Sequence, residues 1–261
     1  MDAATLAAIA RAHVATVPYE NVDIYRGEPP GIEPVSCVDR IVAGRGGYCF
    51  HLNGALITLL EWLQVDVTRH VSGVQGGPDA PGPNGNHLGI TARLPDGTEW
   101  FVDAGLGDGP SDPLPLVFGT YDQHGFTYEL RHSSFDPRGW RFEHDPRGAF
   151  VGADFSSRPA HTEDFLAMHE ELSTAPTSGF VRVLAIMRRT DSSVDILRGC
   201  VRSTITGSTT EAADVDSESD WWEIVIDEFG LAYGDLPADE RTRVWSMVRS
   251  AHETWDAAGR S

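Results

Sequence analysis

The chain has 261 residues, of which 41% are hydrophobic, so it can bury a sizeable core as one large unit or as two to three small ones. Its formal net charge of −19 argues against nucleic acid or an anionic membrane surface as a partner. The sequence has no run of 18 apolar residues, no basic leader and only three cysteines. We therefore expect no membrane span, no secretory signal and no disulfide framework, as in a cytoplasmic enzyme.

The first third of the chain is predicted to be helical. A first helix carries Leu6, Ala10 and His13 on one face, and a second is expected near residues 35–44. A third begins at Cys49 and has apolar residues at helical spacing: Phe50, Leu52, Ala55, Leu56, Leu59, Leu60 and Leu63. Residues 1–84 are assigned to this helical bundle, which ends in a flexible Gly- and Pro-rich boundary at 76–85.

Cys49 is a candidate nucleophile. It follows the tight turn Arg45-Gly46-Gly47 and stands at the N-terminus of the third helix. The positive end of a helix dipole favours the thiolate, which is the reactive form of cysteine. Arg45 is a candidate for electrostatic support, although it can equally cap the turn. Cys37 and Cys200 lack such surroundings and are predicted to be structural.

The next segment supplies a base and an orienting group for this nucleophile. Residues 87–94 and 99–103 alternate like strands, and Pro95-Asp96-Gly97 between them suits a three-residue loop with Gly97 in the left-handed conformation. In that register Gly89 faces Asp103, so His87 and Asp103 are diagonal neighbours on one face. A two-residue loop would put them on opposite faces. His87 is therefore the candidate base, and Asp103 the candidate group that orients it.

The rest of the chain is predicted to be mostly strands, followed by two helices. Residues 85–190 show short alternating segments, clearest at 128–131 and 181–186, which favour an antiparallel barrel or sandwich. Residues 191–261 begin with a strand at 195–198, continue through a polar stretch at 206–220, and end in helices at 221–229 and 238–256. The fold class is α+β. With no CxxC or His-x-x-x-His pattern, we expect no metal site.

Several motifs together resemble the arylamine N-acetyltransferase family over nearly the whole chain. They are Arg45-Gly46-Gly47-Tyr48-Cys49 followed by Asn53, Pro18-Tyr19-Glu20-Asn21 after His13, Val102-Asp103-Ala104-Gly105-Leu106-Gly107, Pro113-Leu114-Pro115-Leu116, Ser173-Thr174-Ala175-Pro176-Thr177-Ser178-Gly179-Phe180, and Glu228-Phe229-Gly230-Leu231. One departure is His51, where the family usually carries Glu or Gln. A separation of two residues on a helix faces away from Cys49, so we expect His51 to be structural or to modulate the site.

The resemblance implies a fold and an activity. The fold is a helical bundle carrying the nucleophile (1–84), a β-barrel carrying the histidine and aspartate (85–190) and an α/β lid (191–261), around a Cys-His-Asp core like that of cysteine proteases. The activity is ping-pong transfer of an acetyl group from acetyl-CoA to an arylamine, arylhydrazine or related amine, as in xenobiotic metabolism, with no permanently bound cofactor. By the same resemblance, the segment containing Gly125, Phe126 and Thr127 edges the coenzyme cleft. Coenzyme A is a polyanion, so its binding to this acidic chain must rely on local arginines and backbone N–H groups, and should be salt-sensitive.

Two other functions share these residues. An amide synthase of the same family would take an acyl chain from a carrier protein and close a macrolactam, and turnover of acetyl-CoA with a small arylamine separates it from the first. A transglutaminase-like or papain-like thiol hydrolase would cleave peptides without acyl-CoA. Outside the triad, His13 is expected to pack in its helix, and Tyr19, Glu20 and Asn21 to clamp the end of that helix. The sequence carries no signal for an oligomeric state.

Overall fold

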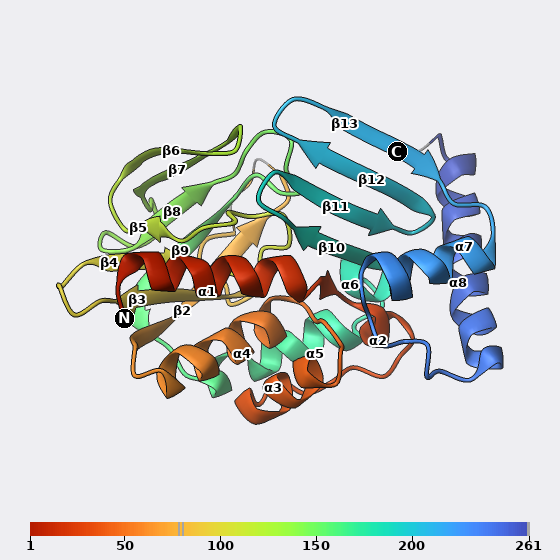
Figure 1. The fold of residues 1–261 in the computed structure, drawn as a ribbon, viewed down its shortest axis with the longest axis horizontal. Coiled ribbons are helices and arrows are strands. Elements are labelled where there is room, and N and C mark those ends of the chain that lie inside the picture. The colour runs from red at the N-terminus through yellow and green to blue at the C-terminus, as the bar shows by residue number, and fades with distance from the viewer. Residues whose placement is uncertain (78, 80, 260–261) are drawn as a thin grey trace.

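Two antiparallel sheets and a layer of helices form the α+β fold (Figure 1). The structure is a computed structural model that describes residues 1–77, 79 and 81–259. The predicted flexible boundary at 76–85 includes residues 78 and 80, which lie outside the described residues. Among the residues described, no helix combines the length and the apolar composition needed to cross a membrane.

The helical layer is built mainly by the N-terminal quarter of the chain. Its helices are α1 (Ala3–Thr16), α2 (Val22–Tyr25), α3 (Pro34–Val42) and α4 (Cys49–Trp62). Helix α1 begins where the Asp2 side chain accepts a hydrogen bond from the backbone N–H of Thr5, a typical N-cap. Its buried face includes Leu6, Ala10 and His13, as the sequence pattern predicts.

A later segment joins this layer. It comprises the 3₁₀ turn Thr162–Phe165, helix α5 (Leu166–Thr174), which lies beside α4 in Figure 1, and helix α6 (Gly179–Arg182), which contacts α2. The ring of Phe165 packs against that of Phe50 on α4, with centroids 5.5 Å apart. The segment lies within residues 85–190, which were expected to form the barrel. That expectation is wrong for this segment, because its apolar side chains complete the core of the helical layer.

The larger sheet has eight strands in the order β5-β4-β3-β2-β9-β8-β7-β6, and every neighbouring pair is antiparallel. The strands are β2 (Asp66–Gln75), β3 (His87–Arg93), β4 (Glu99–Val102), β5 (Leu114–Pro115), β6 (Gly119–Gln123), β7 (Phe126–His132), β8 (Trp140–Glu143) and β9 (Gly152–Pro159). The sheet curls like a barrel around an aromatic core that includes Phe101, Phe142 and Phe155. Strand β2 lies in the region assigned to the helical bundle, so the expected boundary at residue 84 comes too late. The chain enters the barrel directly after α4, because β2 pairs with both β3 and β9.

The smaller sheet has five strands in the order β1-β10-β11-β12-β13. They are β1 (Tyr19–Glu20), β10 (Ala185–Arg189), β11 (Ser193–Arg198), β12 (Val201–Thr206) and β13 (Thr210–Asp214). Helix α7 (Glu218–Glu223), the π-helical turn Ile224–Glu228 and α8 (Ala238–Ala257) follow. The polar stretch at 206–220 therefore contains strand β13, which was not predicted from the sequence. All its residues are exposed, so it lacks the apolar alternation that marks a half-buried strand.

The strand expected at 181–186 is also wrong in its first half. Residues up to Arg182 belong to α6, which Ser178 caps by accepting a hydrogen bond from Phe180 N–H, and the strand begins at Ala185. The side chain of Asn21 stabilises the change from helix α6 to strand β10. It donates hydrogen bonds to the carbonyl oxygens of Phe180 and Val183 and accepts one from Ala185 N–H. The predicted clamp at the end of the first helix therefore reaches a distant segment.

Candidate active site

Cys49 is the first residue of α4, as the sequence predicts. The preceding residue, Tyr48, is extended (φ −95°, ψ −170°), so the helix starts abruptly at the thiol. The turn before it is held by β1, since Gly47 forms an isolated bridge with Tyr19 and accepts a hydrogen bond from Glu20 N–H at 2.9 Å. Cys49 is 4% exposed. The thiol thus lies at the N-terminus of α4, and strand β1 of the five-stranded sheet holds the turn that precedes it.

The hairpin β3–β4 adopts the predicted register. Ile90 pairs with Val102, and Leu94 N–H donates to the carbonyl of Thr98 at 2.9 Å. Gly97 has φ +87°, the left-handed conformation that the three-residue loop requires. His87 and the residue following β4, Asp103, consequently lie on one face of the sheet.

His87 and Asp103 form a buried pair. Nε2 of His87 lies 2.7 Å from Oδ2 of Asp103, and both side chains are at most 2% exposed. Burial alone would lower the pKa of His87, but the Asp103 carboxylate and the neighbouring Cys49 thiol raise it to about 10. Because Nε2 is engaged with Asp103, Nδ1 is the ring nitrogen left to interact with the thiol. The arrangement favours an imidazolium beside Cys49 at neutral pH.

Asn53 holds the carboxylate from the other side. It lies four residues after Cys49, one turn along the same face of α4. Its Nδ2 donates to Asp103 Oδ1 at 2.8 Å and to the carbonyl of Leu88 at 2.6 Å, and its Oδ1 accepts from Ala104 N–H at 2.8 Å. Asn53 stands in the motif around Cys49, but no role for it is evident from the sequence motif alone. Its spacing from Cys49 was the available signal.

The segment after β4 passes very close to the nucleophile. A Cβ on Gly105 would lie 2.7 Å from Cα of Cys49, closer than packed atoms approach, so only glycine fits there. Gly105 N–H also donates to Asp103 Oδ1 at 2.8 Å. The chain therefore carries Asp103 to the start of α4 and fixes its carboxylate through its own backbone.

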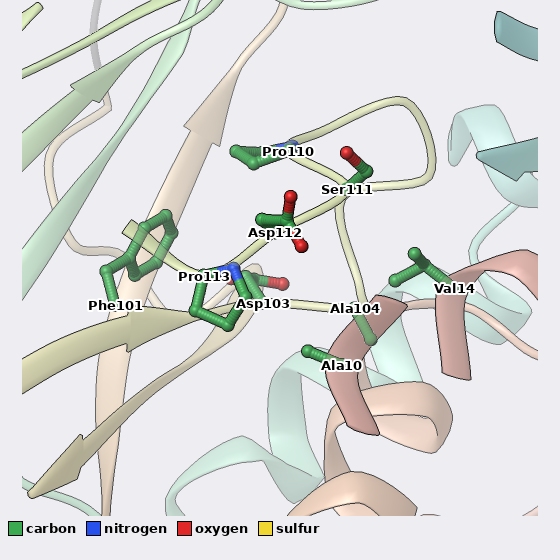
Figure 2. A pocket seen from close by; sticks show the side chains of 9 residues that line it. All are labelled: Ala10, Val14, Phe101, Asp103, Ala104, Pro110, Ser111, Asp112 and Pro113. Atoms are coloured by element: carbon green, nitrogen blue, oxygen red, sulfur yellow. The ribbon is translucent and has the colours of Figure 1, made fainter. Parts of the chain in front are cut away.

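A small pocket lies on the α1 side of Asp103 (Figure 2). Ala10 and Val14 of α1 form one wall, and the opposite wall comes from residues 110–113. Its volume of about 10 Å³ is about the space of one water molecule. This pocket is too small to admit an aromatic substrate.

His51 points away from the thiol, as its helical spacing predicts. Its Nε2 lies 3.3 Å from the carbonyl oxygen of Pro30, and its ring packs on Tyr48 with centroids 5.0 Å apart. Tyr48 in turn bonds to Nδ1 of His169 at 2.5 Å. Burial lowers the pKa of His51 to about 3, so this ring is neutral at physiological pH. These contacts make His51 part of the packing behind the nucleophile.

The other two cysteines have different surroundings. Burial raises the pKa of Cys37 to about 12 and that of Cys200 to about 11. The Cys37 sulfur lies 3.8 Å from the carbonyl oxygen of Phe50, inside the helical layer. Both thiols are therefore held in the protonated form, and neither lies beside the His87–Asp103 pair.

The other candidates for support of the site bind elsewhere. Arg45 forms an ion pair with Asp235 at 2.8 Å, and its guanidinium carbon lies 3.8 Å from the centre of the Tyr233 ring. Glu20 accepts hydrogen bonds from Arg40 and from Val22 N–H. These residues connect the turn before the nucleophile to the C-terminal region, which is a structural task.

The expected coenzyme-binding residues form a hairpin tip. Gly125 stands in the two-residue turn between β6 and β7, Phe126 is 2% exposed, and Thr127 N–H donates to Asp145 at 2.9 Å. A Cβ on Gly125 would lie 3.0 Å from Cα of Gly207, in the turn between β12 and β13. The tip therefore lies where the large sheet meets the small sheet.

Known proteins with the same architecture identify the family. Residues 2–235 match the family model described as N-acetyltransferase. The arylamine N-acetyltransferase of Mycolicibacterium smegmatis is 29% identical over 260 residues, which cover 95% of this chain and 92% of that protein. Human arylamine N-acetyltransferase 1 is 27% identical over 221 residues, which cover 76% of this chain and 75% of that protein.

Solved structures agree with the sequence comparison. The structure of Mycobacterium marinum arylamine N-acetyltransferase in complex with CoA matches with a TM-score of 0.85 at 26% identity, and the match covers 96% of this chain and 93% of that one. An M. smegmatis arylamine N-acetyltransferase structure matches with a TM-score of 0.84 at 29% identity, over 95% and 92% of the two chains. The chain therefore belongs to the arylamine N-acetyltransferase family and is an acyltransferase.

Proposed function

We propose that this enzyme transfers an acetyl group from acetyl-CoA to an arylamine or arylhydrazine through an acetyl-cysteine on Cys49. The observation that carries the proposal is the placement of His87 between the carboxylate of Asp103 and the thiol of Cys49. Family membership supports the reaction class, and the relative solved in complex with CoA supports the coenzyme. The aromatic acceptor is taken from the names of the relatives.

In the first half-reaction the Cys49 thiolate attacks the carbonyl carbon of the thioester. The backbone N–H of Cys49, at the first position of α4, is a candidate donor to the developing oxyanion. The carbon–sulfur bond to coenzyme A then breaks, and the departing thiolate takes the proton of the His87 imidazolium. The products are acetyl-Cys49, free coenzyme A and neutral His87.

In the second half-reaction the amine attacks the acetyl carbon of acetyl-Cys49. His87 takes the proton that the amine nitrogen loses, and the Cys49 thiolate leaves. Asp103 holds the ring and stabilises its positive charge in both halves, and Asn53 fixes Asp103. The cycle restores the imidazolium–thiolate pair and needs neither a metal ion nor a redox group.

The parts of the fold divide these tasks. The helical layer carries Cys49 and the barrel-like sheet carries His87 and Asp103. The five-stranded sheet with its helices is the proposed lid, and the hairpin tip at Gly125, Phe126 and Thr127 edges the coenzyme cleft between lid and barrel. The contact of Gly125 with Gly207 supports this assignment, since it puts the tip at that junction.

Intact-protein mass spectrometry with acetyl-CoA alone tests the proposal. We expect a mass increase of one acetyl group, lost when 4-aminobenzoate or another arylamine is added, and absent in Cys49→Ser. Cys200→Ser is the matched control, because its thiol is remote from His87, and it should acquire the adduct. Adduct formation only from a carrier-bound acyl chain would instead identify an amide synthase, and no adduct from either donor would reject acyl transfer through Cys49.

A further inference from the structure

Arg189, on β10, is a buried cation without a hydrogen-bond partner. The residue is 2% exposed, and none of its three guanidinium nitrogens bonds to any described residue. A guanidinium carries five N–H donors, and an unpaired charged group in a protein interior is strongly disfavoured. Burial accordingly lowers the pKa of Arg189. Nothing in the proposed acetyl transfer assigns this side chain a task.

The ring of Phe126 covers the guanidinium. The guanidinium carbon of Arg189 lies 4.1 Å from the centre of that ring, and the corresponding carbon of Arg147 lies 4.7 Å from the same centre. Phe126 is itself 2% exposed. Two arginines therefore share one aromatic ring, and only Arg147 has polar partners.

The carboxylates nearby are already engaged. Asp145, Asp108 and Asp191 all act electrostatically on Arg189, yet none bonds to it, and Asp191 lies 3.5 Å from Arg11. Asp145 pairs with Arg147 at 2.8 Å, and Asp108 pairs with His144 at 3.2 Å. The donors of Arg189 are thus left for a group that the chain itself does not supply.

Strand β10 connects Arg189 to the nucleophile. Met187 lies two residues earlier on the same face of the strand, about 7 Å away along the chain. It pairs with Tyr19 of β1, and Tyr19 bridges to Gly47 just before Cys49. Residue Arg188 faces the opposite side, where it donates to the carbonyl of Glu228. Arg189 therefore lies on the face of β10 that leads from the thiol to the proposed coenzyme cleft.

The cover over Arg189 is a contact between two hairpin tips. Arg147 donates to the carbonyl of Gly125 on the β6–β7 tip at 2.6 Å and to that of Thr206 on the β12–β13 tip at 2.7 Å. The two tips lie side by side in Figure 1. Phe126 belongs to the barrel core, so a ligand could reach the guanidinium only if these tips separate and Phe126 moves with them.

We propose, on the basis of the acetyl transfer proposed above, that Arg189 recognises an oxyanion on a substrate, a phosphate of the acyl donor or a carboxylate of the acceptor, when Phe126 moves aside. The planar fork of a guanidinium matches both groups in a bidentate way. A chain of net charge −19 repels anionic substrates, and a cation beside the proposed coenzyme cleft would offset that repulsion locally. In this role Arg189 selects substrates by their charge.

Matched substrate pairs test the proposal in Arg189→Gln. The donors are acetyl-CoA and the phosphate-free thioester S-acetyl-N-acetylcysteamine, and the acceptors are 4-aminobenzoate and its uncharged ethyl ester. We expect KM for one charged substrate to rise about tenfold or more, while KM for its uncharged counterpart and kcat change by less than about twofold. The control is Arg188→Gln, on the opposite face of β10, which should leave all four KM values unchanged.

Each outcome decides the proposal. A selective rise for acetyl-CoA assigns the oxyanion to the coenzyme, and a selective rise for 4-aminobenzoate assigns it to the acceptor. No rise, or equal rises for charged and uncharged substrates, overturns the proposal and leaves Arg189 a structural cation. Should Arg189→Gln fail to fold, Arg189→Lys keeps the charge and loses the fork. It should raise KM selectively by about threefold, and the absence of a selective rise again overturns the idea.

Rejection of the proposed acetyl transfer can be distinguished from rejection of the proposed role of Arg189. If the wild-type enzyme forms no adduct with either donor, the transfer itself is rejected. Calorimetric titration of wild type and Arg189→Gln with free coenzyme A and with 4-aminobenzoate then tests Arg189 by binding alone. Weaker binding of either ligand to the variant supports the proposal, and equal affinities for both reject it.

Discussion

The side-chain amide of Asn53 donates to Oδ1 of Asp103 at 2.8 Å, while Oδ2 of the same carboxylate lies 2.7 Å from the ring of His87. Helix α4, which begins at Cys49, thus holds the Asp103 carboxylate that orients His87. Nucleophile, base and acid are connected through α4 as well as through the β3–β4 hairpin. Substitution of Asp103 should therefore change the reactivity of the Cys49 thiol.

Asp103→Asn keeps the shape of the acid and removes its charge. We expect acetylation of Cys49 to slow by about 10³–10⁴-fold, because the imidazolium loses its partner and the wrong tautomer of His87 is favoured. Pre-steady-state acetylation with acetyl-CoA measures this directly. Asp112→Asn is the control, since Asp112 lines the same pocket but pairs with Arg11, and it should acetylate normally. Normal acetylation of Asp103→Asn would make Asp103 structural.

Alkylation by iodoacetamide should be selective for one thiol. At neutral pH we expect Cys49 to react first, since His87 lies beside it, whereas burial holds the pKa of Cys37 near 12 and that of Cys200 near 11. Peptide mapping after short exposure measures the order. Inactivation that follows modification of Cys37 or Cys200 would show that the nucleophile is wrongly assigned.

Steady-state kinetics should show a substituted-enzyme mechanism. One cysteine carries the acetyl group, so coenzyme A must leave before the amine reacts. Initial rates with varied acetyl-CoA and arylamine are expected to give parallel double-reciprocal lines. Intersecting lines would indicate a ternary complex and direct attack of the amine on acetyl-CoA.

His51 and His87 should respond very differently to substitution. His51→Gln retains a donor that can reach the carbonyl of Pro30, so we expect activity within about threefold of wild type and a modest loss of stability. His87→Gln removes the base and should abolish acetylation. Single-turnover rates for the two variants make the comparison. Equal and complete losses would mean that the base has been assigned to the wrong histidine.

Stability should be greatest near pH 6.5. Burial lowers the pKa of His13 and His70 to about 4 and that of His51 to about 3, whereas each titrates near 6.5 when unfolded. Their contribution is complete above pH 6.5 and is lost as the pH falls toward these values. For His87 the pKa is raised to about 10, so its contribution is complete below pH 6.5 and is lost as the pH rises toward 10.

Calorimetric melting curves across this range measure both limbs. For His13 the acid limb corresponds to about 3 kcal/mol. The variant His13→Leu should therefore lose less stability than wild type on acidification, and the exposed His124→Asn should behave like wild type. An identical acid limb in His13→Leu and wild type would show that this histidine does not control acid unfolding.

Local sequence signals predicted the elements whose conformation is decided locally. The Pro95-Asp96-Gly97 turn selects its own type, because Gly97 takes a positive φ at no steric cost, and the turn then sets the register of β3 and β4. The start of α4 at Cys49 follows in the same way from the turn and the apolar repeat after it. Both features involve residues close together in the chain.

The errors came from elements whose conformation depends on distant partners. The pattern at 181–186 is strand-like, but Asn21, 159 residues before Phe180, bonds to the backbone there and lets a short helix precede β10. Strand β13 has no buried face and exists because it pairs with β12. Neither partner is visible in a local window of sequence.

The sequence alone determined which residues carry the candidate chemistry, since the helix start presents Cys49 and the hairpin register aligns His87 with Asp103. Only the tertiary structure decided that Asn53 donates a hydrogen bond to Asp103, that His51 packs behind the nucleophile, and that Arg189 is buried without a hydrogen-bond partner among the described residues. Turn sterics and strand alternation act over a few residues, so they can be predicted from the local sequence. Burial and long-range hydrogen bonding depend on which surfaces meet when the helical layer and the two sheets pack together.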